Sequence, residues 1–136
     1  MNVLVDTSVW SIVLRKNNSD PQSNSVRKIV ADLIQEFRVS IIGPIRQEIL
    51  SGISNHNQFL KLRETLHSFE DCPLYSLDYE RAAEMFNICR KKGIQGSHID
   101  FLICAAAEKN HLSIFTMDRD FQHYAKYLSV RLFKHP

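Results

Sequence analysis

Residues 2–10 read NVLVDTSVW, and this short stretch decides the fold class. The β-branched, apolar run of residues 2–5 predicts a short buried strand that ends at Asp6. From Thr7 to Leu14 the apolar residues have helical spacing, which predicts a helix directly after the strand. A strand that passes through a tight turn into a helix is typical of α/β proteins with parallel sheets.

The rest of the chain continues to alternate strands and helices. Further strands are predicted at 38–42, 74–77, 112–116 and 129–133, helices at 26–37, 43–52, 59–69, from 82 to near 93, at 98–109 and once more before 129, and a loop at 16–24. The alternation predicts a three-layer α/β/α domain with a central, mainly parallel sheet. The length of 136 residues suits one domain that spans residues 1–136.

Composition sets weak bounds on function. Lys and Arg number 17 against 15 Asp and Glu, and this net charge of +2 is too small to indicate nucleic-acid binding by itself. The cysteines, Cys72, Cys89 and Cys104, are widely spaced and suit neither a disulfide framework nor a zinc site. No apolar run has the length of a membrane span and no leader is evident, so a cytoplasmic protein without membrane contact is expected.

Four acidic residues lie where apolar runs meet predicted helices: Asp6, Glu48, Asp100 and Asp118. In a parallel sheet, such residues can meet at the edge formed by the carboxyl ends of the strands, where ligands bind. Two carboxylates about 4 Å apart repel by roughly 4 kcal/mol at an effective dielectric of about 20. A cluster of these acids therefore calls for a divalent cation, and oxygen ligands suit Mg²⁺ or Mn²⁺.

Each acid also has an ordinary structural interpretation. Asp6 can cap the helix that follows it. Glu48 can be a solvated helix residue, and Asp100 can belong to a capping box that begins at Ser97. Asp118 and Asp120 can be first-turn acids that the helix dipole favours. Only the joint placement of these residues distinguishes a metal site from a set of unrelated caps.

Four segments resemble the motifs of PIN-domain proteins, in the order that the family shows. They are VLVDTSVW (residues 3–10), QEILSG (47–52), HIDFLICAA (98–106) and FTMDRDF (115–121). The segments extend over essentially the whole chain, and the length is similar to that of the VapC-type toxins of toxin–antitoxin pairs. Ser8 stands where the family commonly has asparagine, but no acidic motif residue is missing.

The resemblance implies a metal-dependent endoribonuclease that uses Mg²⁺ or Mn²⁺ and hydrolyses phosphodiester bonds in RNA, a structured RNA such as tRNA being a guess from the family. It also implies neutralisation by a VapB-type antitoxin and assembly as a homodimer. Carried over by position, Asp6, Glu48, Asp100 and Asp118 would be the catalytic and metal-binding residues. Thr116 and Asp120 would support them.

Basic side chains should surround an acidic pocket that receives RNA, because Lys and Arg bind phosphate without reading sequence. Arg15, Lys16, Arg46 and Arg119 are the candidates, although each can also be ordinary solvated surface. Trp10 could stack on a base, but core packing or a dimer contact is the stronger interpretation.

Three other functions compete with the nuclease. A haloacid-dehalogenase-like phosphatase needs a second Asp two residues after the first, where this chain has Ser8. A response-regulator receiver needs adjacent acids after its first strand, which are absent here. A non-catalytic PIN-fold module that binds RNA or protein stays open as the alternative function.

Overall fold

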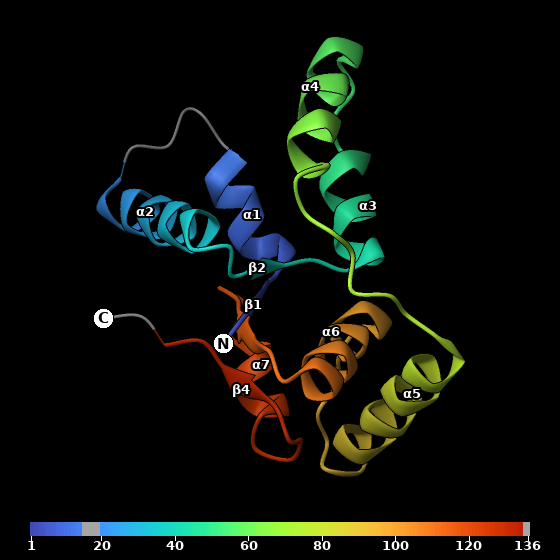
Figure 1. The fold of residues 1–136 in the computed structure, drawn as a ribbon. Helices are drawn as coiled ribbons and strands as arrows, with labels where there is room; N and C mark the ends of the chain where they lie inside the picture. The colour runs from blue at the N-terminus through green and yellow to red at the C-terminus, as the bar shows by residue number, and fades with distance from the viewer. Residues whose placement is uncertain (15–19, 135–136) are drawn as a thin grey trace.

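A four-stranded sheet lies at the centre of the computed structural model, which describes residues 1–14 and 20–134 (Figure 1). The strands are β1 (Val3–Val5), β2 (Val39–Ser40), β3 (Ser113–Phe115) and β4 (Arg131–Leu132). The helices are α1 (Thr7–Leu14), α2 (Pro21–Gln35), α3 (Gly43–Ser51), α4 (His56–Leu66), α5 (Ser76–Lys91), α6 (His98–Asn110) and α7 (Asp120–Tyr124). Among the described helices, none combines the length and the apolar character needed to cross a membrane.

The sheet is parallel throughout and has the strand order β2-β1-β3-β4. The three residues of β1 are fully buried because a neighbouring strand pairs with each side of β1 and helices cover its faces. In register, Leu4 lies between Ser40 of β2 and Ile114 of β3. The continuous apolar sequence of β1 is thus the composition expected of a strand buried on both faces.

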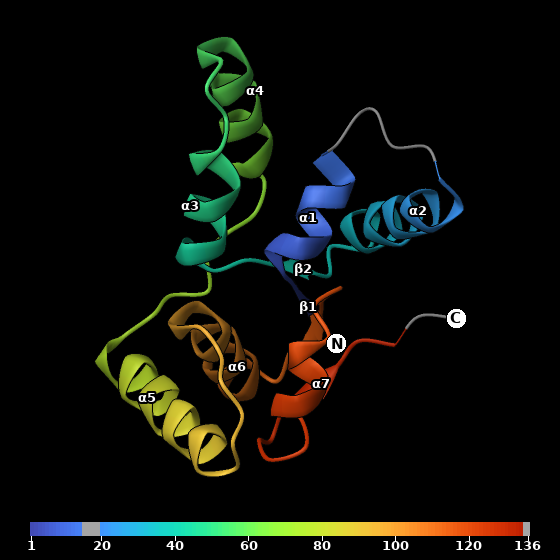
Figure 2. The same ribbon diagram turned by 180° about the vertical axis from the view of Figure 1, so that it is seen from behind.

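Connectivity distributes the helices over the two faces of the sheet. The chain moves from β1 to β2 in one direction across the sheet and from β2 to β3 in the other, so right-handed crossovers place their helices on opposite faces. Figures 1 and 2 show α1 and α2 together, away from α5, α6 and α7. The rings of Phe101 on α6 and Tyr124 on α7 lie 4.9 Å apart, which joins these two helices. The predicted three-layer α/β/α class is confirmed.

Helix α2 begins earlier than the sequence pattern predicts. Residues 21–24, predicted as loop, form its first turn, while residues 16–19 of that predicted loop lie outside the described residues. The Asp20 carboxylate caps the helix, since its Oδ1 accepts from the Ser23 amide at 2.9 Å. Pro21 occupies the first helical position, where the missing amide hydrogen costs nothing. The Asp-Pro pair is therefore a helix start and not a loop signal.

The predicted strand at residues 74–77 is wrong. Helix α5 begins at Ser76, and the carboxylate of Asp78 closes its first turn by accepting from the Tyr75 amide at 2.8 Å. Leu77 is 75% exposed, so the apolar residues here do not form the buried face that a strand would need. The described pairing nearest to this region is an isolated parallel bridge between Ile41 and Asp71.

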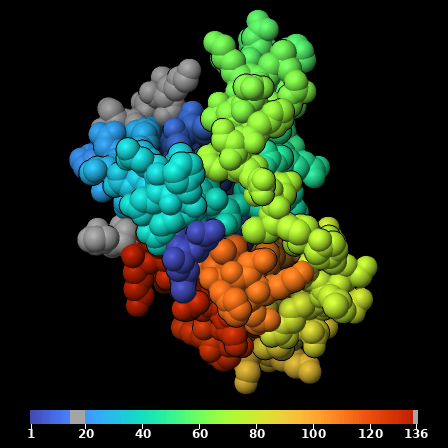
Figure 3. Space-filling model, viewed as in Figure 1, coloured from blue at the N-terminus to red at the C-terminus, as the bar shows by residue number. Residues whose placement is uncertain are grey.

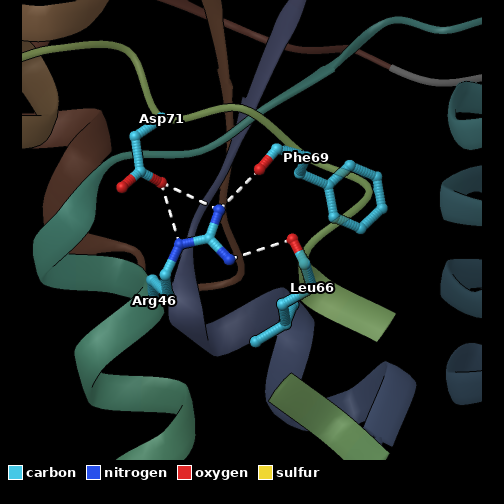
Figure 4. Close-up of polar contacts among 4 residues, drawn as sticks. All are labelled: Arg46, Leu66, Phe69 and Asp71. Carbon is cyan, nitrogen blue, oxygen red and sulfur yellow. Dashed lines mark hydrogen bonds and ion pairs between the residues drawn. The ribbon is translucent and has the colours of Figure 1, made fainter. Parts of the chain in front are cut away.

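Helices α3 and α4 form a hairpin whose α4 end projects beyond the rest of the molecule (Figure 3). Arg46 of α3 fastens the base of this hairpin (Figure 4). Its Nε donates to Oδ1 of Asp71 at 2.9 Å, Nη1 donates to the Leu66 carbonyl at 2.9 Å and Nη2 donates to the Phe69 carbonyl at 2.6 Å. One guanidinium therefore holds α3 to the segment that leaves α4.

Replacement of Arg46 by alanine should lower the free energy of unfolding by about 2 kcal/mol, because three acceptors lose a charged donor and the ion pair is only partly exposed. Urea denaturation followed by circular dichroism measures this change. Arg63→Ala, an exposed arginine on α4, is the control and should change the stability little. Equal effects of the two substitutions would contradict the role of Arg46 in holding α3 to the segment that leaves α4.

Candidate active site

The carboxyl ends of β1 and β3 meet at one edge of the sheet. The Asp6 amide donates to the Phe115 carbonyl at 2.9 Å, so the ladder between the strands continues one residue past β1. The Asp6 carbonyl then accepts from the amides of Val9 and Trp10, at 3.0 and 3.1 Å, and so starts α1. The backbone of Asp6 is fixed on both sides, which leaves its side chain at the sheet edge beside Thr116.

Two hydroxyl groups converge on one oxygen of the buried Asp6 carboxylate. Ser8 Oγ and Thr116 Oγ1 each donate to Asp6 Oδ2 at 2.8 Å. The two hydroxyl oxygens are 3.3 Å apart, and because each has a single hydrogen, which it gives to Asp6, their mutual contact carries no further bond. Their lone pairs accept instead from the amides of Met117 and Asp118, at 2.9 and 3.0 Å. This network holds the loop after β3 against Asp6.

Asp118 takes up its position through the same network. Its amide is bound by Thr116, and its Oδ1 accepts from the Asp120 amide at 2.9 Å at the start of α7. Asp118 therefore lies just before α7, and the acid in the first turn of this helix is Asp120. Thr116 links Asp118 to Asp6, because it donates to the Asp6 carboxylate and accepts from the Asp118 amide. Asp120 is exposed, and in the described residues its carboxylate makes no hydrogen bond or ion pair.

Asp100 enters the cluster from α6. Its amide donates to Ser97 Oγ at 3.1 Å, which is the predicted cap, and its Oδ2 accepts from the Tyr124 hydroxyl at 2.7 Å. Burial raises the pKa of Asp100, the charges on Asp118 and Asp6 raise it further, and the hydrogen bonds from Tyr124 and Ser97 oppose the shift. Asp100 thus lies within the electrostatic field of the other two acids.

Tyr124 is the residue that sequence reasoning missed. Its side chain is fully buried, and burial and the hydrogen bond to Asp100 both raise the pKa of its hydroxyl, which therefore stays a neutral donor. Gly96 makes room for it: a Cβ at position 96 would collide with the Tyr124 hydroxyl, would lie 2.8 Å from its Cζ and would lie 2.9 Å from Cε2 of Phe101. No local pattern signals this contact, because it depends on how α7 packs against α6.

Glu48 is the acid that the structure does not join to the others. It lies on α3, which packs against α1, and its side chain is exposed. Across residues 1–14 and 20–134, no hydrogen bond or ion pair connects Glu48 to another side chain. Over the same residues, no three His, Cys, Asp or Glu side chains lie close enough together to hold a metal ion as they stand.

Even without Glu48, the carboxylates of Asp6, Asp100 and Asp118 fit a hard cation. Asp6 and Asp118 each use one carboxylate oxygen for hydrogen bonds, and the second oxygen of each accepts none from the described residues. Asp100 adds a third carboxylate within their field. Mg²⁺ commonly takes only one or two protein carboxylates and completes its shell with waters and substrate phosphate. A ready-made cage of three side chains is therefore not required.

The predicted RNA-binding arginines differ in availability. Arg46 is occupied by Asp71 and two carbonyls, whereas Arg119 is exposed beside Asp118. Arg15 and Lys16 lie outside the described residues. Trp10 is a core residue: it is 3% exposed, and its indole donates to the Val5 carbonyl at 3.1 Å.

Comparison with known proteins supports the fold. A sequence model of the PIN domain matches residues 3–127, while no curated protein matches the chain. The structure is similar to a chain of FitAcB from Neisseria gonorrhoeae, with 22% identity, 97% and 96% of the two chains covered and a TM-score of 0.77.

It is also similar to chains of two complexes bound to DNA. For VapBC2 from Rickettsia felis, bound to a fragment of its promoter, the identity is 15%, both chains are covered completely and the TM-score is 0.75. For VapBC from Salmonella typhimurium, the identity is 16%, the coverage is 98% and 97% and the TM-score is 0.72. At such identities these likenesses show a shared fold.

Gly96→Ala should lower the free energy of unfolding by about 1–3 kcal/mol, because the new methyl group overpacks a buried ring that cannot move aside. Gly52→Ala is the matched control, since a Cβ there meets nothing within 4 Å, and it should be close to neutral. Thermal or urea unfolding of both variants tests whether the absence of a side chain at Gly96 makes room for the Tyr124 ring. Equal stability of the two variants would refute it.

Asp100→Asn should stabilise the metal-free protein at neutral pH. The folded-state pKa of Asp100 is raised, so this group favours folding below its ordinary pKa of 3.8 and loses that contribution as the pH rises through the folded value. The asparagine side chain keeps an acceptor for Tyr124 without the charge. Urea unfolding in EDTA should show the gain near pH 7 and its loss toward pH 3, with the exposed Glu80→Gln unchanged as control.

Proposed function

The chain belongs to the PIN domain family, and on that premise we propose that it is a metal-dependent endoribonuclease of the VapC toxin type. One observation carries the proposal: Ser8 and Thr116 hold the carboxylate of Asp6 at the sheet edge, Thr116 also binds the amide of Asp118, and the charges of Asp6 and Asp118 both act on Asp100. A buried carboxylate that keeps one oxygen free in the company of two other acids is costly unless it binds a cation.

Asp6 and Asp100 are the proposed ligands of Mg²⁺ or Mn²⁺, with Glu48 and Asp118 completing the shell or orienting the attacking water. When bound, the ion supplies a Lewis acid for the phosphoryl oxygen and lowers the pKa of a coordinated water. In-line hydrolysis of the phosphodiester would then leave a 5′-phosphate and a 3′-hydroxyl, as the family resemblance implies.

The chain's own hydroxyl groups set the orientation of the ligands. Ser8 and Thr116 fix the orientation of the Asp6 carboxylate, because both give their only hydrogen to its Oδ2 and leave Oδ1 free. Tyr124 does the same for Oδ2 of Asp100. Such supporting hydrogen bonds fix ligand orientation in metal sites, and their loss typically reduces metal affinity or activity by about 10- to 100-fold.

The partners belong to the same proposal. The similar structures are described as FitAcB and VapBC complexes, which supports a VapB-type antitoxin as the partner that would neutralise this chain. A structured RNA such as tRNA as substrate, a homodimer, a single domain over residues 1–136 and a cytoplasmic location complete the proposal. Each of these rests on the family and on the sequence.

A non-catalytic PIN-fold module is the second candidate, and one observation favours it. No three potential metal ligands are assembled among the described residues, and Glu48 is apart from the other acids. In that case the carboxylates would have structural roles, since that of Asp118 accepts from the Asp120 amide and that of Asp100 accepts from the Tyr124 hydroxyl. Metal binding separates the two candidates.

The nuclease proposal predicts that purified protein cuts cellular RNA into discrete fragments with Mg²⁺ or Mn²⁺ and leaves it intact with EDTA. Asp6→Asn should abolish cleavage. Thr116→Val should reduce the rate by about 10- to 100-fold, because Asp6 loses one of its two supports. Thr65→Val, an exposed threonine of α4, is the matched control and should cut like the parent protein.

Thermal unfolding with added Mn²⁺ decides between the two candidates. A functional site predicts stabilisation that grows as RT ln(1 + [L]/Kd) and disappears in Asp6→Asn. Intact RNA together with no stabilisation by metal would refute the nuclease and leave the binding module.

A further inference from the structure

A groove of about 450 Å³ borders the acidic cluster on the side of β4. Ile114, Met117 and Leu132 are apolar residues that line the groove and are called its floor below, and Phe133 lines it as well. Its polar wall contains Thr116 and Asp118, and Arg119, Gln122 and Lys134 also line it. The volume lies in the range of pockets that hold small organic ligands.

Strand register places this groove on the same face of the sheet as the carboxylate of Asp6. Ile114 pairs with Leu4 of β1 and with Leu132 of β4, and side chains two residues apart share a face, so Thr116 follows Ile114 as Asp6 follows Leu4. Thr116 therefore lies between Asp6 and the groove, because its hydroxyl binds Asp6 and the residue also lines the groove. A ligand in the groove would lie directly beside the proposed metal site.

The cations of the groove have no competing carboxylate partner. Arg119 and Lys134 are exposed, and neither takes part in an ion pair within the described part of the chain. Other basic side chains are already engaged: Arg81 with Glu108, Lys109 with Asp78 and Arg46 with Asp71. The groove thus offers two available positive charges next to three carboxylates.

We propose that this groove binds a nucleotide next to the scissile phosphate, with the base on the apolar floor and a flanking phosphate on Arg119 and Lys134. This inference rests on the proposed nuclease function and adds a position for the substrate. Bases pack on apolar surfaces irrespective of sequence, which suits the floor that Met117 and Leu132 help to form. Gln122 provides donors and an acceptor for the edge of a base.

The floor is rigid enough to act as a binding surface. The Met117 amide is tied to Ser8 Oγ, and the Phe133 amide donates to the Ile114 carbonyl at 2.8 Å. The ring of Phe133 packs against Phe115 on the other face of the sheet, with 5.2 Å between centroids, and this contact anchors the segment that follows β4. The groove therefore needs little reorganisation to receive a base, and preorganised sites lose less free energy on binding.

Methyl-detected NMR of the whole protein in EDTA tests the groove without any chemistry. Adenosine 5′-monophosphate should shift the methyl signals of Ile114, Met117 and Leu132 with a Kd in the millimolar range. Ribose 5-phosphate, which lacks the base, should leave these signals in place. Equal shifts with both compounds, or none with either, would overturn the proposal.

A pair of charge reversals provides the matched control. Lys134→Glu should weaken binding of adenosine 5′-monophosphate by about fivefold, because it removes a phosphate contact. Lys61→Glu changes the net charge by the same amount on α4, far from β4 in Figure 1, and should have little effect. If both variants bind equally well, the groove cation plays no part and the proposal fails.

The experiments distinguish a wrong assignment of the nucleotide site in the groove from a wrong assignment of the nuclease function. Cleavage of RNA in the presence of metal with no nucleotide binding in the groove would retain the nuclease and reject the subsite. Nucleotide binding in EDTA that Lys134→Glu weakens supports the subsite whether or not a metal is present.

Discussion

The junction at Asp6 is the constraint on which the rest of the structure depends. One residue ends the central strand, starts α1 through its carbonyl and receives the two hydroxyl groups that fix the loop after β3. The Trp10 indole closes the same junction from the helix side by donating to the Val5 carbonyl. Strand pairing and helix start use the backbone of Asp6, whereas the loop position uses its side chain, so a residue without Asp's acceptor oxygens would release the loop after β3.

The same junction brings negatively charged side chains together. Hydrogen bonds, and not basic side chains, offset the unfavourable free energy of holding these carboxylates close to one another. Burial and two neighbouring acids raise the pKa of Asp100, while the buried hydroxyl of Tyr124 partly offsets the shift. No Lys or Arg forms an ion pair with Asp6, Asp100 or Asp118 within the described residues. Unfavourable charge that is held in place but left unneutralised is typical of functional sites.

The sequence predicted the α/β class and the position of Asp6 and Asp118, because both follow from local rules. Short apolar strands imply a parallel sheet, and the carboxyl ends of adjacent parallel strands share an edge. The sequence did not predict the hydrogen bond from Tyr124 to Asp100. That bond requires α7 to approach α6 over Gly96. The wrong strand at 74–77 had a similar origin, since the cap at Asp78 outweighed the apolar composition around it.

The arginines show why closeness in sequence is a poor guide to a binding surface. Arg46 and Arg119 each lie within two residues of a predicted acid, yet only Arg119 is available. Arg46 points toward the chain leaving α4, where the carbonyls of Leu66 and Phe69 accept from its guanidinium (Figure 4). The basic surface available to a phosphate is therefore what remains after the fold has satisfied its own carbonyls, and among the described residues beside the acids it consists of Arg119 and Lys134.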